Sequence, residues 1–180
     1  MVLKSLLKVA VLAGLLCLLH GRVFSFTSML SDSMAPSLRA EHFFQDTVLV
    51  DHVTLAWRGP RRGEIVRMVH RAQAEREDYF FKRVAALPGE RIEIRDGGLL
   101  IDGRPLREPA LFRFLRYTNE GHASAGVTLE VASGAYFVLG DNSADSYDSR
   151  YWGGLRRDDI LGLGAMIVWP PHRFGRVSAF

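Results

Sequence analysis

Hydrophobic and polar residues alternate along much of this chain in short runs, and a period of two residues predicts β-strands. Such runs lie at Val48–Val50, Glu64–Val69, Tyr79–Val84, Arg91–Arg95, Leu99–Ile101 and Val127–Val131. Two further runs, Ala135–Leu139 and Ile160–Trp169, are almost continuously apolar and predict buried strands. Asp96-Gly97 and Asp102-Gly103 are dipeptides typical of tight hairpin turns. The pattern therefore predicts an all-β core of sandwich or barrel type.

The N-terminal run is apolar over a longer stretch than most of the predicted strands. Residues 5–19 are apolar apart from Lys8. The uncharged part, Val9–Leu19, is shorter than the roughly 20 residues that span a bilayer. Lys8 and Arg22 can lengthen the span by placing their charges at the membrane surface. We expect residues 1–24 to form a cytoplasmic tip and one transmembrane helix, with a cleavable signal peptide as the alternative.

Length and composition indicate one main domain. A chain of 180 residues with 48% hydrophobic content can bury one core. We expect residues 25–180 to form an extracytoplasmic β-rich domain in which 98–134 is a small inserted subdomain. The net charge is +3, but arginines are scattered along the chain, so nucleic acid is not an expected partner.

Metal and disulfide chemistry have little support in the sequence. Cys17 is the only cysteine, which rules out an intrachain disulfide and a cysteine-based metal site. The six histidines show no close ligand spacing. We therefore expect no metal centre.

The segment Gly140–Gly153 is unusually polar for a connection between two apolar strands. It contains three aspartates, three serines, an asparagine and an arginine, and it closes with Tyr151-Trp152-Gly153. Buried polar groups without partners cost about 1–3 kcal/mol each, so these side chains need partners if the loop is ordered. A hairpin with Asx-type turns is the structural alternative to a functional role.

Ser33 and Lys82 are the residues that could give this loop a chemical purpose. Ser33 lies in a turn constrained by Pro36, and Lys82 shares a strand face with Phe80 and Val84. A lysine acts as a general base only when neutral, so its pKa must fall from about 10.4 by about two to three units. Burial among apolar side chains has this effect. A turn serine and a strand lysine that reaches solvent are the alternative interpretations.

Four boxes of residues occur in a characteristic order. They are Ser31-Asp32-Ser33-Met34-Ala35-Pro36-Ser37-Leu38, Arg62-Gly63-Glu64-Ile65-Val66, Tyr79-Phe80-Phe81-Lys82-Arg83-Val84 with Pro88-Gly89-Glu90, and Gly140–Gly153. Each resembles a box of the type I signal peptidases, or leader peptidases, which are membrane-bound Ser/Lys proteases. The boxes follow an N-terminal apolar segment, as in the family, and the resemblance spans about Arg22 to Trp169.

The resemblance implies roles for individual residues. Ser33 would be the nucleophile and Lys82 the general base of a mechanism that passes through an acyl-enzyme. Ser146 would orient the lysine amine, and the Ser31 hydroxyl with the Ser33 backbone N–H would form the oxyanion hole. The implied structural support of the site is Asp141, Asp148 and Arg150. The resemblance implies no metal and no organic cofactor.

The resemblance also implies substrates and location. The substrates would be secretory preproteins with small residues at the last and third-last signal-peptide positions, bound as an added strand. The protein would be a single-pass protein of the cytoplasmic (inner) membrane, with its catalytic domain on the extracytoplasmic side. The side chains considered for contact with membrane lipid are Phe24, Phe26, Met29 and Trp57, for which core packing is the alternative.

The sequence departs from the family pattern at Asp32, Ala86 and Ser143-Ala144. Asp32 would raise the pKa of Lys82 if its carboxylate faced the amine. Two other functions stay open: a specialised processing protease with one dedicated pre-protein, and a non-catalytic membrane-anchored β-domain.

Overall fold

The computed structural model describes residues 21–40, 45–70 and 79–177, with five positions of the N-terminal run, Ser5, Lys8, Val9, Val11 and Gly14. Within these ranges no helix is long and apolar enough to cross a membrane. Most of the anchor predicted at 1–24 and the loop predicted at 71–78 lie outside the described residues.

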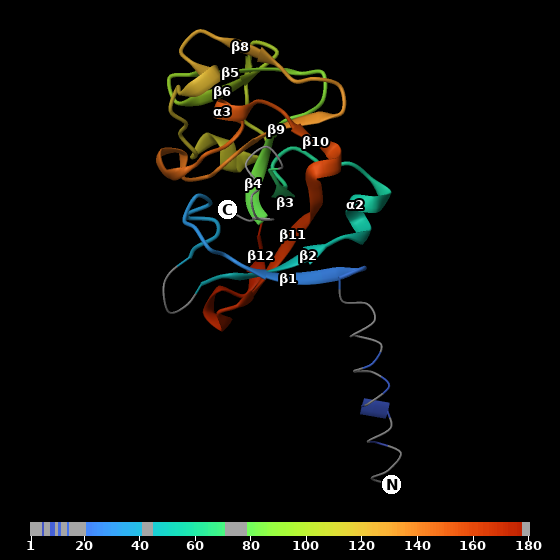
Figure 1. Cartoon of the computed structure of the whole chain (residues 1–180). Coiled ribbons are helices and arrows are strands. Elements are labelled where there is room, and N and C mark those ends of the chain that lie inside the picture. The colour runs from blue at the N-terminus through green and yellow to red at the C-terminus, as the bar shows by residue number, and fades with distance from the viewer. Residues whose placement is uncertain are drawn as a thin grey trace.

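An eight-stranded antiparallel sheet forms the larger part of the fold (Figure 1). Its strands lie in the order β1 (Phe24–Ser28), β2 (Thr47–Asp51), β11 (Ile160–Trp169), β3 (Ile65–Val69), β4 (Tyr79–Ala86), β9 (Ala135–Leu139) and β10 (Leu155–Arg156), and β12 (Gly175–Arg176) pairs with β11. The pairings along this sheet are antiparallel. The mainly β fold predicted from the alternation is confirmed.

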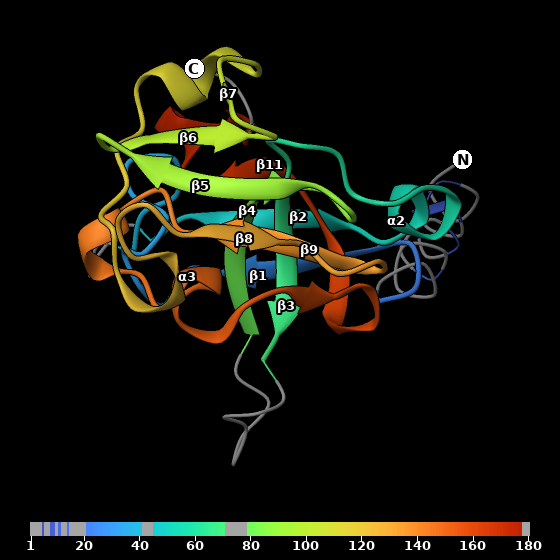
Figure 2. The same cartoon turned by 90° about the horizontal axis from the view of Figure 1, so that it is seen from above.

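A smaller four-stranded sheet lies over one end of the first. Its order is β7 (Arg104–Pro105), β6 (Gly98–Ile101), β5 (Arg91–Arg95) and β8 (Thr128–Glu130). Seen from above, β5 and β6 run across the direction of β3 and β4 (Figure 2). Most of this sheet falls in the range 98–134 predicted as an insert, but its central strand β5 begins earlier, at Arg91. The proposed domain division stays a prediction.

Both predicted hairpin turns join strands of the smaller sheet. Asp96 and Gly97 have φ angles of 53° and 76° and connect β5 to β6. Asp102 and Gly103 have φ angles of 50° and 76° and connect β6 to β7. Two left-handed residues in a row match the right-handed twist of the paired strands, which is why Asp-Gly is favoured there.

Two short α-helices and several 3₁₀ turns were not predicted. The α-helices are α2 (Val53–Trp57) and α3 (Ser149–Trp152), and the 3₁₀ turns are η2 (Ala110–Arg113), η3 (Gly121–Ala123), η4 (Ser143–Asp145), η5 (Arg157–Asp159) and η6 (Pro171–Arg173). They escape detection in the sequence because helices of four or five residues do not complete two turns, so no 3.6-residue period develops. Local hydrogen bonds support them instead: the Asp51 carboxylate accepts from the Thr54 backbone N–H at 2.9 Å at the start of α2.

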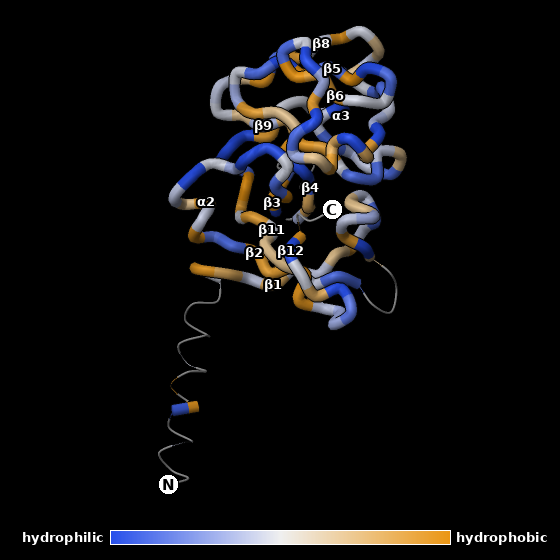
Figure 3. The backbone as a smooth tube through the Cα atoms, turned by 180° about the vertical axis from the view of Figure 1, so that it is seen from behind, coloured by the Kyte–Doolittle hydropathy of each residue, from blue (hydrophilic) through white to orange (hydrophobic). Residues whose placement is uncertain are grey.

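The core fixes the position of the segment that carries Ser33. Met34 and Leu38 are fully buried against Phe81 of β4 and the strands β2 and β3. Figure 3 shows hydrophobic residues gathered along strands of the main sheet. Met29 belongs to this core, whereas Phe26 and Trp57 are exposed, Trp57 at 87%. Of the side chains considered for lipid contact, Met29 is therefore a core residue.

Candidate active site

Ser33 lies in the turn region after β1, buried beside the polar stretch Gly140–Gly153. Its backbone carbonyl accepts a hydrogen bond from the Asn142 backbone N–H at 3.0 Å, and the Asn142 side chain donates to the Asp32 carbonyl at 3.2 Å. The Asp32 side chain is exposed, and its carboxylate accepts from the Ala40 backbone N–H at 2.9 Å. The polar stretch thus holds the backbone of the serine in place.

Lys82 meets Ser33 from strand β4. Lys82 pairs with Val66 of β3, and strand alternation places it on the same face as Phe80 and Val84. Its side chain is only 3% exposed, and the Nζ atom donates a hydrogen bond to Ser33 Oγ at 2.7 Å. Ser31 Oγ lies 3.3 Å from the same Ser33 oxygen and donates to it. The structure brings these three residues together from two separate segments.

Burial lowers the pKa of Lys82 from 10.5 to about 8. Removal of the ammonium group from water is the largest cause, and the positive charge of Arg150 acts in the same direction. The carboxylates of Asp148, Asp141 and Asp145 oppose it by stabilising the ammonium form. A sizeable fraction of the amine is therefore neutral near physiological pH, as a general base requires.

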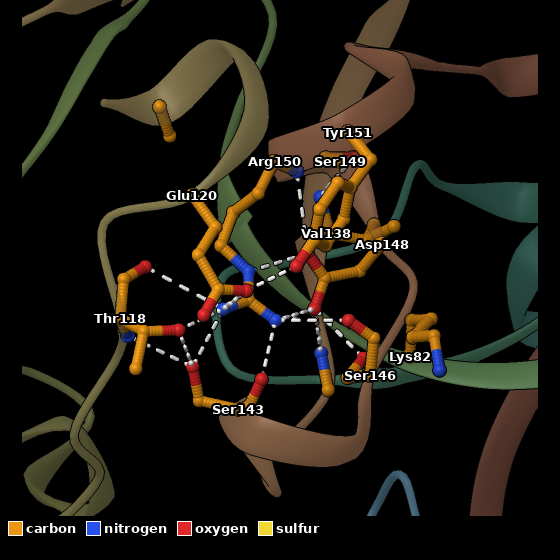
Figure 4. A network of polar contacts seen from close by, with 12 residues as sticks. Lys82, Thr118, Glu120, Val138, Ser143, Ser146, Asp148, Ser149, Arg150 and Tyr151 are labelled. Carbon is orange, nitrogen blue, oxygen red and sulfur yellow. Dashed lines mark hydrogen bonds and ion pairs between the residues drawn. The ribbon is translucent and has the colours of Figure 1, made fainter.

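Ser146 lines the same pocket, but its hydroxyl donates to Asp148 Oδ2 at 2.7 Å. Among the described residues no hydrogen bond joins Ser146 to the Lys82 amine, and Figure 4 shows the two side chains next to each other. The same Asp148 carboxylate accepts from the Gly140 backbone N–H at 3.0 Å. Asp148 therefore fixes the Ser146 hydroxyl, and the orientation of the lysine by Ser146 stays a prediction.

Gly140 allows this close approach. A Cβ atom at position 140 would lie 2.1 Å from Ser146 Oγ and 2.5 Å from the Ser33 carbonyl oxygen. Non-bonded contacts of a Cβ atom are essentially never this short. The Ser33 carbonyl belongs to the backbone and cannot turn aside as a flexible side chain can. Only glycine at the end of β9 lets Ser33 and Ser146 come together.

Asp141 pairs with an arginine that sequence reasoning missed. Arg83 follows Lys82 on β4, and its Nε and Nη2 atoms donate to the two oxygens of Asp141 at 2.7 and 2.6 Å. The Ser37 hydroxyl donates to the same carboxylate. Both charged groups are almost fully buried. This ion pair ties β4 and the end of β9 to the segment that carries Ser33.

Arg150 is fully buried and holds the polar stretch together (Figure 4). Its Nε donates to Asp148 Oδ1 at 2.8 Å, and its Nη2 donates to the carbonyls of Ser143 and Ser146 at 2.7 and 3.0 Å. Its Nη1 donates to Thr118 Oγ1 at 2.7 Å, from a segment that sequence reasoning did not assign to the site.

A pocket of about 510 Å³ opens at the Ser33–Lys82 contact. Its walls come from β3, β4, α3 and the connections between strands of the larger sheet. The lining residues are Ser31, Ser33, Met68, His70, Phe80, Lys82, Ala144, Asp145, Ser146, Tyr147, Tyr151 and Trp152. Within the described part of the chain, no group of His, Cys, Asp or Glu is arranged to hold a metal ion. The pocket combines a hydroxyl, an amine of lowered pKa and apolar walls, which suits nucleophilic attack by the hydroxyl on a bound substrate.

Comparison with known proteins gives consistent relatives. The family described as signal peptidase, peptidase S26, matches residues 2–169. Signal peptidase I of Leptolyngbya laminosa is 32% identical over 154 residues, covering 82% of this chain and 70% of that protein. Signal peptidase I U of Bacillus subtilis is 35% identical over 145 residues, covering 77% of this chain and 72% of that protein. A crystal structure of a signal peptidase I from Enterococcus faecalis is 32% identical, with a TM-score of 0.46, and covers 59% of this chain and 97% of that chain.

Proposed function

Because this chain belongs to the S26 family of signal peptidases, which are serine proteases, we propose that it removes signal peptides from secretory preproteins with a Ser33–Lys82 dyad. The observation that carries the proposal is the 2.7 Å contact between Lys82 Nζ and Ser33 Oγ. Both side chains are buried, and this contact opens into a pocket.

In the acylation step, neutral Lys82 accepts the Ser33 hydroxyl proton while Ser33 Oγ attacks the scissile carbonyl carbon. The tetrahedral intermediate collapses, the C–N bond breaks, and Lys82 passes the proton to the leaving amine. In the second step Lys82 takes a proton from a water molecule that attacks the ester carbonyl. The ester bond to Ser33 breaks, and the proton returns to Ser33 Oγ. The products are the signal peptide with a free carboxylate and the mature protein with a free amine.

The developing negative charge needs donors close to Ser33. We assign this role to the Ser33 backbone N–H and the Ser31 hydroxyl, which lies 3.3 Å from Ser33 Oγ. The Ser31 hydroxyl is free to turn from Ser33 Oγ to the substrate oxygen once the ester bond forms. One such donor contributes about 3–4 kcal/mol of transition-state stabilisation in serine proteases.

The proposed substrates carry small residues at the last and third-last positions of the signal peptide and bind as an extended strand. We further propose that residues 1–24 anchor the protein in the cytoplasmic membrane with the catalytic domain on the extracytoplasmic side. Exposed Phe26 and Trp57 would then contact the lipid surface. A chain that complements loss of the general signal peptidase acts on many preproteins, and one that does not complement it acts on a dedicated one.

The test is cleavage of a preprotein with an Ala-x-Ala site by the full chain in a non-ionic detergent, with the new N-terminus identified by mass spectrometry. We expect Ser33→Ala to lower the rate by at least about 10³-fold. Ser28→Ala is the matched control, since the Ser28 hydroxyl contacts Thr47 on the β1–β2 pair. Cleavage by Ser33→Ala at the wild-type rate would exclude the proposed function.

A further inference from the structure

The segment Tyr117–Gly121 connects the smaller sheet to the active-site loop. The Tyr117 backbone N–H donates to the Gly97 carbonyl at 3.0 Å, and the Asn119 side chain donates to the Ile94 carbonyl at 2.7 Å. Gly97 and Ile94 belong to the β5–β6 hairpin. The residues on either side of Thr118 are therefore fixed to the smaller sheet.

Thr118 bonds in the other direction, to the polar stretch (Figure 4). Its Oγ1 atom accepts from Arg150 Nη1 at 2.7 Å, and its backbone N–H donates to Ser143 Oγ at 2.9 Å. Ser143 Oγ also accepts from Arg150 Nη1 at 2.7 Å. The two hydroxyls thus take the two N–H groups of one guanidinium nitrogen.

Gly121 allows the segment to pack this closely. A Cβ atom at Gly121 would lie 2.5 Å from the Arg150 carbonyl oxygen, and the residue has a left-handed φ of 57°. Both the contact and the backbone conformation require glycine. The segment is therefore built to lie directly against the backbone of Arg150.

A buried arginine has five N–H donors, and each needs an acceptor. Without the Thr118 hydroxyl, the nearest remaining acceptors for one Nη1 proton are the Thr118 carbonyl, at 3.4 Å, and the Glu120 carboxylate, at 3.8 Å. The guanidinium would then turn towards another acceptor and loosen its bonds to Asp148. Asp148 holds the Ser146 hydroxyl, so a shift of Arg150 reaches the lysine environment.

We propose that Thr118 is a positioning residue for the proposed peptidase activity: its hydroxyl holds Arg150, and through Arg150 it holds Asp148 and Ser146 beside Lys82. The smaller sheet would then act as a support for the catalytic pocket. This inference rests on the proposed function, and it assigns part of the catalytic geometry to a segment outside the four boxes.

The direction of the expected pH effect follows from the charges around Lys82. Asp148, Asp141 and Asp145 raise the pKa of Lys82, and Arg150 lowers it. Around Arg150 the charged and titratable groups are Asp148, Glu120 and Tyr151. If Arg150 moves away, its positive charge lowers the pKa of Lys82 less. The negative charge of Asp148 is then also less neutralised by its ion pair with Arg150 and stabilises the ammonium form more. Both changes raise the pKa of Lys82.

The experiment measures kcat for preprotein cleavage from pH 6 to 10 with the full chain. Thr118→Val, which keeps the shape and removes the hydroxyl, should move the midpoint of the rising limb upward by about 0.5 to 1 pH unit. It should lower kcat at pH 7 by about threefold to tenfold, with recovery above the new midpoint. Thr118→Ser, which keeps the hydroxyl, should have a midpoint close to that of the wild type. The matched control is Thr128→Val, because Thr128 is exposed on β8 of the smaller sheet.

An unchanged midpoint of the pH profile in Thr118→Val would overturn the inference. This holds even if the melting temperature of the variant has fallen, since a merely structural role changes stability without moving the pH profile. This failure differs from failure of the proposed function. If wild-type chain cleaves, Ser33→Ala does not, and Thr118→Val matches wild type, only the role of Thr118 is refuted. If Ser33→Ala cleaves, or wild type does not, the proposed function is refuted and the inference with it.

Discussion

Replacement of Lys82 with methionine should abolish cleavage and stabilise the fold at neutral pH. Methionine has a similar length and is flexible enough to fill the same space without a charge. In the wild-type chain, burial lowers the pKa of Lys82 from 10.5 to about 8. A difference of this size means that the protonated amine costs the folded state about 3 kcal/mol. Lys82→Met removes this cost together with the proposed general base.

The pH dependence of the effect gives it a specific signature. Between about pH 8 and 10.5 the unfolded chain still binds a proton at Lys82 that the folded chain has released. The free energy of unfolding of the wild type therefore rises with pH through this window, relative to Lys82→Met. The stability advantage of Lys82→Met is largest below pH 8 and shrinks by about 3 kcal/mol by pH 10.5.

The assay is urea unfolding of the full chain, followed by tryptophan fluorescence at several values between pH 7 and 11 in one detergent. Lys8→Met is the control, because Lys8 is exposed and its variant should follow the wild-type curve. A gap between wild type and Lys82→Met that stays constant over this range would refute the reasoning. It would mean that the folded and unfolded states bind the Lys82 proton equally well.

Other predictions concern the supports of the site. Gly140→Ala should reduce kcat at least about 100-fold, because the added Cβ would lie 2.5 Å from the Ser33 carbonyl, while Gly175→Ala, with open space at its Cβ, should cleave at the wild-type rate. Kinetics of both variants on one preprotein check this, and equal rates would contradict it. Asp141→Ala leaves the buried Arg83 charge without its partner and should lower the free energy of unfolding by about 3–5 kcal/mol in urea titrations, whereas a loss below about 1 kcal/mol would show that the pair is not needed. Ser31→Ala should lower kcat by about 10²- to 10³-fold with little change in KM, and an equal rise in KM instead would assign Ser31 to substrate binding.

The sequence predicted the parts of the fold that depend on local pattern. Alternation located β3, β4 and β5, and the Asp-Gly dipeptides located two turns, because side-chain period and left-handed backbone are local properties. The short helix α2 was missed because its start is set by the Asp51 carboxylate and not by a repeat. Most of the membrane span predicted at 1–24 lies outside the described residues.

The supports of the site depend on contacts that local pattern does not reveal. Arg83 and Asp141 lie 58 positions apart in the chain, and Thr118 and Arg150 lie 32 apart. Alternation indicated that Arg83 lies on the opposite strand face from Lys82, but it did not indicate that the Asp141 carboxylate lies beside Arg83. An arginine on the same predicted strand as the proposed base was the signal available, since a charge on a strand that enters the core needs a partner. Thr118 lies in an irregular segment where neither period nor spacing distinguishes it.

The central claim is that a neutral Lys82 activates Ser33, and the pH profile of kcat/KM tests it most directly. Preprotein cleavage by the full wild-type chain should be measured from pH 6 to 11 at constant ionic strength. The account predicts that kcat/KM rises with a midpoint at about pH 8, the pKa of the buried amine, and then levels off. A rise with its midpoint near 10.5, the value of a solvated lysine, or a rate independent of pH would contradict it.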